Sequence, residues 1–372
     1  ELHLIECTGT DFATGKLSFS DIEIAEITTF EKVWSAYEGG LGNKGVSFYK
    51  PVNLPEEFQC LGFLGHPNIK SLSSGRILVA KGKDHDFDHK PTLQNPVDYT
   101  LVWGHAESNV KVSGPAYFWL PIAPNGYKSL GYVVTKKLEK PGPKDVLCVL
   151  DDLTDSCKAT DSIWGTESPS TFNVWNVAPV LIGTESKGIP VGSFYCSIGN
   201  NTSSVPIVCL KNSMFSISSM PSLPQLKTLI SNHSPTFFFH PEELYFPSSI
   251  SWLFTKGVLL HAKKDERTML VSNDGSNLPM GGTDDDEYWI DFPSGNNKDE
   301  IKKGNLSTAQ VYIHAKPMLG ATFTDIAVWI YYPFNGPATA KVELLDLKLG
   351  KIGEHISDWE HVTLRISNFT GD

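Results

Sequence analysis

The stretch Val46-Ser47-Phe48-Tyr49-Lys50-Pro51, which leads to Leu61-Gly62, is repeated further along this chain. Tyr117-Phe118-Trp119-Leu120-Pro121 leads in the same way to Leu130-Gly131, and each element recurs after about 70 residues. The 372 residues include 24 prolines and 31 glycines and show no long helical pattern, which is typical of a turn-rich β protein. The repeat therefore predicts a duplicated all-β unit.

A third, more degenerate copy runs from Phe172-Asn173-Val174-Trp175 to Val191-Gly192. Each copy is followed by a short apolar run that suits a buried strand, at residues 76–80, 146–149 and 207–210. A unit this small cannot bury its own apolar face, so three copies predict a closed, pseudo-threefold arrangement. We expect an N-terminal β-prism-like domain over residues 1–212, and a sandwich of duplicated hairpins is the competing architecture.

The second half has a different pattern. Residues 213–235 are rich in serine and proline, and within them Leu223–Ile230 is the best helix candidate, with Pro224 near its first turn. We expect this segment to be a linker, with the domain boundary near Asn212. Residues 236–372 are then expected to form the N-terminal part of a β-sandwich domain.

Charge and size restrict the classes of function. A chain of this length is expected to form two domains. The net charge of −11 argues against a nucleic-acid partner, because phosphate binding needs a basic face. No run approaches the roughly 20 apolar residues of a membrane helix.

The six cysteines allow two alternatives. Cys148 with Cys157, and Cys196 with Cys209, could each join a local hairpin as a disulfide, or all could stay reduced and buried. The absence of a Cys-x-x-Cys pair argues against a zinc site.

The chain starts at Glu1 without a methionine and stops at Asp372, directly after an acidic strand. A sandwich that ended there would leave an open edge. We therefore expect a processed chain whose C-terminal sandwich is completed by a second polypeptide.

That acidic strand is Gly353-Glu354-His355-Ile356-Ser357-Asp358-Trp359-Glu360-His361-Val362-Thr363-Leu364-Arg365-Ile366. Alternation places Asp358 and Glu360 on one face with the apolar residues that follow them, and His355 arrives from the preceding turn. Burying charge without a partner is costly, and a divalent cation such as calcium or magnesium would compensate for it. Alternatively, these side chains sit at an exposed strand end and only cap a neighbouring loop.

Several segments together resemble the plant vacuolar-protein-sorting-62-like family. They are residues 96–103, 117–121 with 126–127, 152–155, 240–243, 322–327, 331–339, 350–355 and 358–361, so the resemblance covers nearly the whole chain. The resemblance implies the prism-like fold. The name of the family records a trafficking phenotype rather than a chemistry. A vacuolar, endomembrane or extracellular location is thus favoured over the nucleus.

The C-terminal half also resembles, more distantly, the secreted necrosis-inducing Nep-like cytolysins, which have an actinoporin-like β-sandwich. In that family the matching run holds a divalent cation that helps to dock a membrane glycolipid. The resemblance implies His355, Asp358 and Glu360 as ligands here. Asn335 stands where the family has an acidic residue, and Ser357 replaces a histidine; both are weaker ligands than the groups they replace.

Three further residues could join this site. His240 and Glu243 follow an aromatic run, and they could instead pair with each other and with the backbone. Asp325 opens the stretch 323–332, which is apolar on both faces, as expected of a central sandwich strand.

The patterns favour a non-enzymatic protein that binds a membrane lipid or a glycan headgroup, as an adaptor or as a pore-former after assembly. The alternative is a metal-assisted hydrolase with Glu360 as base and His355 as ligand or acid, or a glycosidase that uses Asp358 and Glu360. A structural or storage protein without a ligand is the third class. Binding without turnover would separate the first class from the second, and the third predicts neither.

Overall fold

The computed structural model describes residues 8–83, 90–104, 110–166, 171–199, 201–264, 266–280, 287–295, 297–342 and 345–372. Over these residues the protein is all-β with a few short helices, as the sequence predicts. The chain divides into two compact units. The first comprises Glu1–Ser234, Lys316–Thr324 and Arg365–Asp372, and the second Pro235–Ala315 and Asp325–Leu364.

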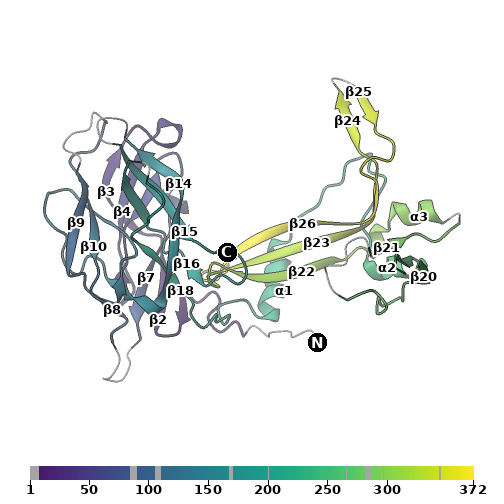
Figure 1. Ribbon diagram of the computed structural model, residues 1–372, viewed down its shortest axis with the longest axis horizontal. Coiled ribbons are helices and arrows are strands. Elements are labelled where there is room, and N and C mark those ends of the chain that lie inside the picture. Colours follow the sequence, from purple (N-terminus) through teal and green to yellow (C-terminus); the bar gives the residue numbers. More distant parts are fainter. Residues whose placement is uncertain are drawn as a thin grey trace. The chain divides into compact units, whose positions relative to one another are not determined.

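Three antiparallel three-stranded meanders carry the repeat in the first unit (Figure 1). The predicted aromatic stretch of each copy becomes the middle strand of its meander. The strands are β3 (Phe30–Ala36), β4 (Val46–Pro51) and β6 (Leu64–Pro67); β9 (Asp98–Gly104), β10 (Tyr117–Ile122) and β12 (Val133–Thr135); and β14 (Thr154–Gly165), β15 (Phe172–Pro179) and β17 (Phe194–Ile198).

Each copy also contributes to a second three-stranded set, whose middle strand is the apolar run predicted after that copy. The long strand β14 belongs to both sets of the third copy, because it pairs first with β18 and then with β15. The sets are β2 (Ile22–Ile27), β7 (Ile77–Gly82) and β5 (Gln59–Cys60), with β1 (Lys16–Phe19) added beside β2; β8 (Leu93–Gln94), β13 (Cys148–Leu150) and β11 (Tyr127–Lys128); and β14, β18 (Val208–Lys211) and β16 (Gly188–Ile189).

One tryptophan from each copy meets at the centre of the core under the meanders. The ring centroids of Trp34, Trp103 and Trp164 lie 5.7–6.3 Å apart in all three pairs, with the rings edge to face. The indole nitrogens link the copies as well, since Trp34 Nε1 donates to the Gly114 carbonyl at 2.7 Å and Trp164 Nε1 to that of Glu38 at 2.8 Å. The three copies thus share one aromatic core, while the prism geometry itself remains a prediction.

The copies also approach one another at Gly62, Gly131 and Ser193. A Cβ atom on Gly131 would lie 2.2 Å from Ser193 Oγ and 2.8 Å from the Cα of Gly62. In the third copy the residue that meets Gly62 and Gly131 is Ser193, not Gly192 as the repeat in the sequence suggests. Gly192 is one residue more than the other copies have before this point, and it adopts a left-handed conformation (φ 86°). This crowding allows glycine alone at positions 62 and 131.

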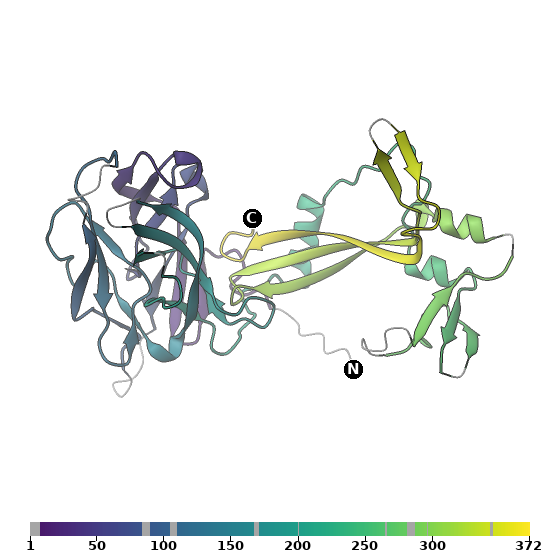
Figure 2. The same cartoon turned by 45° about the horizontal axis from the view of Figure 1, so that its top comes forward.

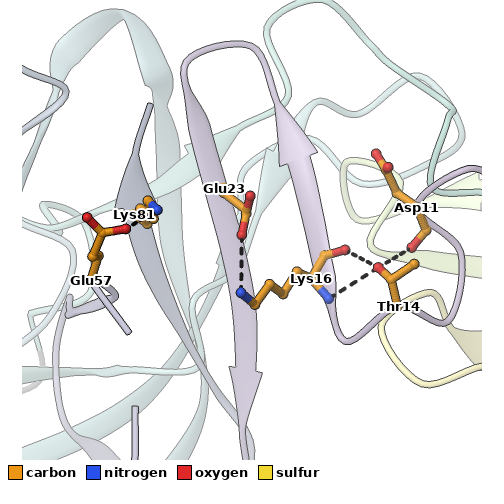
Figure 3. A network of polar contacts seen from close by, with 6 residues as sticks. All are labelled: Asp11, Thr14, Lys16, Glu23, Glu57 and Lys81. Carbon is orange, nitrogen blue, oxygen red and sulfur yellow. Dashed lines mark hydrogen bonds and ion pairs between the residues drawn. The ribbon is translucent and has the colours of Figure 1, made fainter. Parts of the chain in front are cut away.

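Charged pairs lie on the exposed side of the first sheet (Figure 3). Lys16 Nζ on β1 is 3.7 Å from Glu23 Oε1 on β2, and Lys81 on β7 pairs with Glu57. The hydroxyl of Thr14 lies 2.9 Å from the Asp11 carbonyl and 2.6 Å from that of Lys16, at the turn before β1. Exposed pairs of this kind add little stability but keep the sheet edge polar.

The predicted helix forms as α1 (Leu223–His233), which confirms the sequence interpretation. Ser222 is its N-cap residue, and the Gln225 side chain reaches back to accept from the Ser222 backbone N–H at 2.8 Å; Pro224 occupies the first turn. The helix belongs to the first unit.

Two segments from late in the sequence complete the first unit. The Asn212 side chain donates to the Gly320 carbonyl at 3.0 Å, and that of Asn368 to the Ala321 carbonyl at 2.9 Å. Phe369 is 1% exposed and packs into the core beneath the second set of sheets. The first unit is therefore closed by residues near position 370.

The second unit contains most of the sheet β22-β23-β26, in which β23 is the middle strand, as predicted for its residues (Figure 2). A separate core lies around Leu253, Phe292 and Phe334, and the actinoporin-like sandwich remains a prediction. The elements are α2 (Ile250–Phe254), β19 (Leu259–Ala262), β20 (Arg267–Leu270), β21 (Tyr288–Asp291), α3 (Lys298–Lys303), β22 (Val311–Met318), β23 (Phe323–Asn335), β24 (Thr339–Val342), β25 (Leu345–Lys348) and β26 (His355–Ser367).

The local disulfides allowed by the sequence do not form. Cys148, Cys157, Cys196 and Cys209 are all free thiols. Cys148 lies beside Ser129 and Cys196 is buried in the aromatic core, so neither faces its sequence neighbour. The reason is that strand pairing, rather than proximity in sequence, decides which cysteines meet. Cys7 lies outside the described residues.

Candidate functional site

The acidic motif begins strand β26, and two of its predicted ligands contact each other. His355 Nε2 lies 3.3 Å from Asp358 Oδ1, while His355 Nδ1 donates to the Gly353 carbonyl at 3.1 Å. The side chains of His355 and Asp358 are 50% and 24% exposed. Between them Ser357 adopts a left-handed backbone conformation (φ 64°), which breaks the regular alternation of the strand. Its hydroxyl lies 2.7 Å from that of Tyr331.

The other acidic groups gather around Tyr332 on β23. Burial raises the pKa of the Tyr332 hydroxyl, and the negative charges of Glu243, Glu360 and Asp358 raise it further. The three carboxylates therefore lie near enough to Tyr332 to act on its hydroxyl. Asn335 completes the group, since its amide donates to the Gly353 carbonyl at 3.0 Å, the same carbonyl that His355 contacts.

His240 and Glu243 bond to nearby backbone. His240 Nδ1 accepts from the Glu242 N–H at 3.2 Å, and Glu243 Oε1 accepts from the N–H groups of Leu244 and Tyr245, both at 2.9 Å. These bonds correspond to the backbone pairing that the sequence left open as the alternative. His240 is exposed, whereas Glu243 is half-buried and contributes its charge to the Tyr332 surroundings.

Asp325 lies elsewhere. It is 7% exposed and sits near the opposite end of β23 from Asn335. Ten residues of extended strand span about 33 Å, so Asp325 does not reach the motif.

The acidic face of β26 is not buried, in contrast to the first of the two alternatives that the sequence allows. Asp358 is half-buried, Glu360 is exposed, and Val362 beyond them is 37% exposed. Within the described residues, no group of three or more His, Cys, Asp or Glu side chains is placed to hold a metal ion. The carboxylates and the Asn335 carbonyl oxygen are nevertheless hard donors of the kind that calcium and magnesium prefer. The cation site remains a prediction.

A cluster of aromatic side chains lies on the opposite side of the motif strand. The Trp359 ring centroid is 5.0 Å from that of Tyr331 and 5.2 Å from that of Tyr312, and His361 stacks on Trp329 at 4.2 Å. Trp359 is 41% exposed, and His361 is exposed as well. Such faces can stack on a flat apolar group while their polar atoms stay hydrated.

Sequence analysis missed a second exposed feature, the loop that follows β15. Val180, Leu181 and Ile182 are 47%, 70% and 59% exposed. The backbone beneath them is held in place, because the Ser186 hydroxyl donates to the Leu181 carbonyl at 2.6 Å and Lys158 Nζ to the Val180 carbonyl at 3.3 Å. Three adjacent aliphatic residues resemble any buried strand segment in sequence, so nothing in the pattern distinguishes this loop. We call residues 180–182 the aliphatic loop.

No helix among the residues that the structure describes is both long and apolar enough to cross a bilayer.

Comparison with known proteins gives one family. The family described as "Vacuolar protein sorting-associated protein 62" matches residues 5–372. The solved structure of GNIP1Aa from Chromobacterium piscinae is similar at 19% identity and a TM-score of 0.39, over 57% of this chain and 41% of that chain. The matched part thus spans less than half of that protein. No curated protein sequence gives a significant match.

Proposed function

The chain belongs to the vacuolar protein sorting-associated protein 62 family, and from that premise we propose that it binds a membrane surface without catalysing a reaction. The observation that carries the proposal is the aliphatic loop, with its three adjacent exposed side chains. Single exposed aliphatic residues are normal on soluble proteins, but a contiguous group on an ordered loop is typical of an interaction site. The family description, which refers to vacuolar sorting, fits a target on an endomembrane.

The energetics suit shallow insertion. Complete burial of one Val, Leu or Ile side chain is worth about 1.5–3 kcal/mol, so three partly buried residues can hold a protein reversibly at the headgroup boundary. Lys158 lies at the base of the aliphatic loop, and one lysine near an anionic membrane contributes about 1 kcal/mol. Because the net charge is −11, general electrostatic adsorption is unfavourable and insertion must supply most of the affinity.

Sedimentation with vesicles tests this proposal. Phosphatidylcholine vesicles, with and without phosphatidylserine, are incubated with the wild type, with Leu181→Asp and with Leu138→Asp. Leu138 is a matched control, because it is 62% exposed on a different loop. We expect Leu181→Asp to weaken binding at least tenfold, since inserting a carboxylate into the interface is costly. Leu138→Asp should bind like the wild type.

Two results would oppose the proposal. The wild type could stay in the supernatant with both vesicle compositions, or both variants could lose binding equally. Circular dichroism of each variant distinguishes lost binding from lost folding.

The aromatic cluster around Trp359 favours a second candidate, recognition of a glycan. Trp359 is exposed and supported on two sides by Tyr312 and Tyr331, so its ring is held ready to stack on a sugar. Binding of the protein to a glycan array, lost in Trp359→Ala but retained in Leu181→Asp, would support this candidate over the membrane.

The divalent cation belongs to the same proposal. Asp358, Glu360, His355 and Asn335 would hold calcium or magnesium beside Tyr332 and bridge the protein to an acidic headgroup. The metal-assisted hydrolase, with Glu360 as base, is the alternative for this strand. It predicts turnover of an ester or glycoside substrate that stops in Glu360→Gln, whereas a binding protein shows none.

A further inference from the structure

Two cysteines that are distant in sequence are adjacent in the structure. Strand β18 pairs with the start of β14 so that Cys209 lies opposite Asp155 and Val208 opposite Ser156. Cys157 is two residues beyond Asp155, on the same face, and is therefore the diagonal neighbour of Cys209. The two side chains are close enough for a hydrogen bond between their thiols.

The contact lies where β14 changes partners. Residues Thr154–Ser156 pair with β18, and from Cys157 onward β14 pairs with β15. The thiol of Cys157 donates to the carbonyl of Ile207, at 3.0 Å, on the strand that leads into β18. Both cysteines therefore lie at the junction between the two ladders that β14 joins.

The two sulfurs have different environments. Cys157 is half-buried and Cys209 is 1% exposed. The hydrogen bond with Cys209 lowers the pKa of the Cys157 thiol, while the same contact and then burial raise the pKa of the Cys209 thiol. A reagent from solvent would therefore react first with Cys157, which is more accessible and more readily ionised, while Cys209 lies buried next to it.

We propose that Cys157 and Cys209 are a disulfide-forming pair that is oxidised by exchange with a small-molecule disulfide such as oxidised glutathione. The Cys157 thiolate attacks one sulfur of the glutathione disulfide, forms a mixed disulfide and releases one glutathione thiolate. Cys209 then loses its proton, attacks the Cys157 sulfur and releases the second glutathione. Two protein thiols are oxidised and one glutathione disulfide is reduced to two thiols.

The bond would fasten β14 to β18 across the third copy. It closes a loop from Cys157 to Cys209 that contains most of β14 and all of β15, β16 and β17, and cross-linking a long loop restricts the unfolded chain. We expect the oxidised protein to melt about 5 °C or more above the reduced protein.

The experiment uses the full chain, reduced and then incubated with oxidised glutathione. Intact mass should fall by two hydrogens, and non-reducing peptide mapping should find the peptides of Cys157 and Cys209 joined. The joined peptides should be absent in Cys157→Ser and in Cys209→Ser, and present in Cys148→Ser. Cys148 is the matched control because it is a buried strand cysteine that contacts Ser129 instead of another thiol.

Other outcomes would overturn the proposal. Cys157 could retain a stable glutathione adduct, both thiols could remain unmodified, or a disulfide to another cysteine could form instead. If Cys209→Ser fails to fold, Cys209→Ala removes the thiol without introducing a buried hydroxyl and replaces it in the same comparison.

Discussion

His66 shows how a single buried side chain makes the stability of this protein depend on pH. It lies on β6, is 7% exposed, and its Nε2 is 3.3 Å from the hydroxyl of Ser74. Burial lowers the pKa of this imidazole, and the nearby charge of Lys70 lowers it further. The folded protein therefore binds a proton at this site less readily than the unfolded chain does.

We expect stability to fall as the pH decreases. Above the unfolded histidine pKa of about 6.5, the imidazole is neutral in both states and contributes nothing. Below that pH the imidazole is protonated in the unfolded chain but still neutral in the folded protein. The free energy of unfolding therefore decreases with falling pH until the pH drops below the lowered pKa of His66 in the folded protein. The loss of urea midpoint between pH 7.5 and pH 5.5 should be smaller in His66→Gln than in the wild type. Equal losses would contradict this role of His66.

At the same scale, residue chemistry predicted the candidate site only in part. The grouping of His355 and Asp358 was expected from the motif and that of Asn335 from the family resemblance, but the direct contact of His355 with Asp358 spans three residues of one strand and depends on the break in alternation at Ser357. The separation of Asp325 from Asn335 follows from strand length, once both are assigned to β23. The left-handed conformation of Ser357 could not be predicted, because serine rarely adopts it and tertiary contacts with Tyr331 hold it there.

Strand β26 carries the acidic motif on one face and aromatic residues on the other. The sequence indicates this alternation, and the contacts of Trp359 and His361 with Trp329 agree with it. The exposure of the acidic face could not be read from the sequence, because it depends on which elements cover the sheet. The aliphatic loop escaped prediction for the same reason.

Ion dependence tests the motif as an element. If Asp358 and Glu360 hold a cation, calcium or magnesium at a hundred times its dissociation constant should stabilise the protein by about 2.7 kcal/mol relative to EDTA. Asp358→Ala should abolish the shift in melting temperature. The control Asp299→Ala, on the exposed first turn of α3, should keep it. An absent shift in the wild type would leave His355 and Asp358 as a cap on the strand end.

At the scale of the whole molecule, the threefold repeat organises the first unit. Its first two copies were predictable because Leu61-Gly62 and Leu130-Gly131 recur at the same spacing. The third copy was only partly predictable, since the extra residue Gly192 moves Ser193 into the place of the glycine. The contact of Cys157 with Cys209 depends on pairing between strands far apart in sequence, which spacing alone does not reveal.

The crowded meeting of the copies gives a prediction about packing. Gly131→Ala would place a methyl group 2.2 Å from Ser193 Oγ, and we expect it to destabilise the protein by about 3 kcal/mol. Adding Ser193→Gly should recover part of this loss, because the closest colliding atoms are removed. Gly142→Ala, whose added Cβ would have no neighbour nearer than 3.4 Å, is the control. Urea unfolding measures all four proteins, and similar stability of Gly131→Ala and Gly142→Ala would refute the close approach.

The way Phe369 closes the first unit has a consequence for synthesis on the ribosome. Its ring is fully buried in the core of the first unit beneath the second set of sheets, and the carbonyls of Asn368 and Phe369 accept hydrogen bonds from the N–H groups of Ala13 and Gly15. A nascent chain that has reached Ser234 therefore contains all three copies but lacks a piece of their core. The first unit can complete its folding only after the second unit has been translated, so the N-terminal copies must remain competent to fold, and protected from aggregation, throughout that interval.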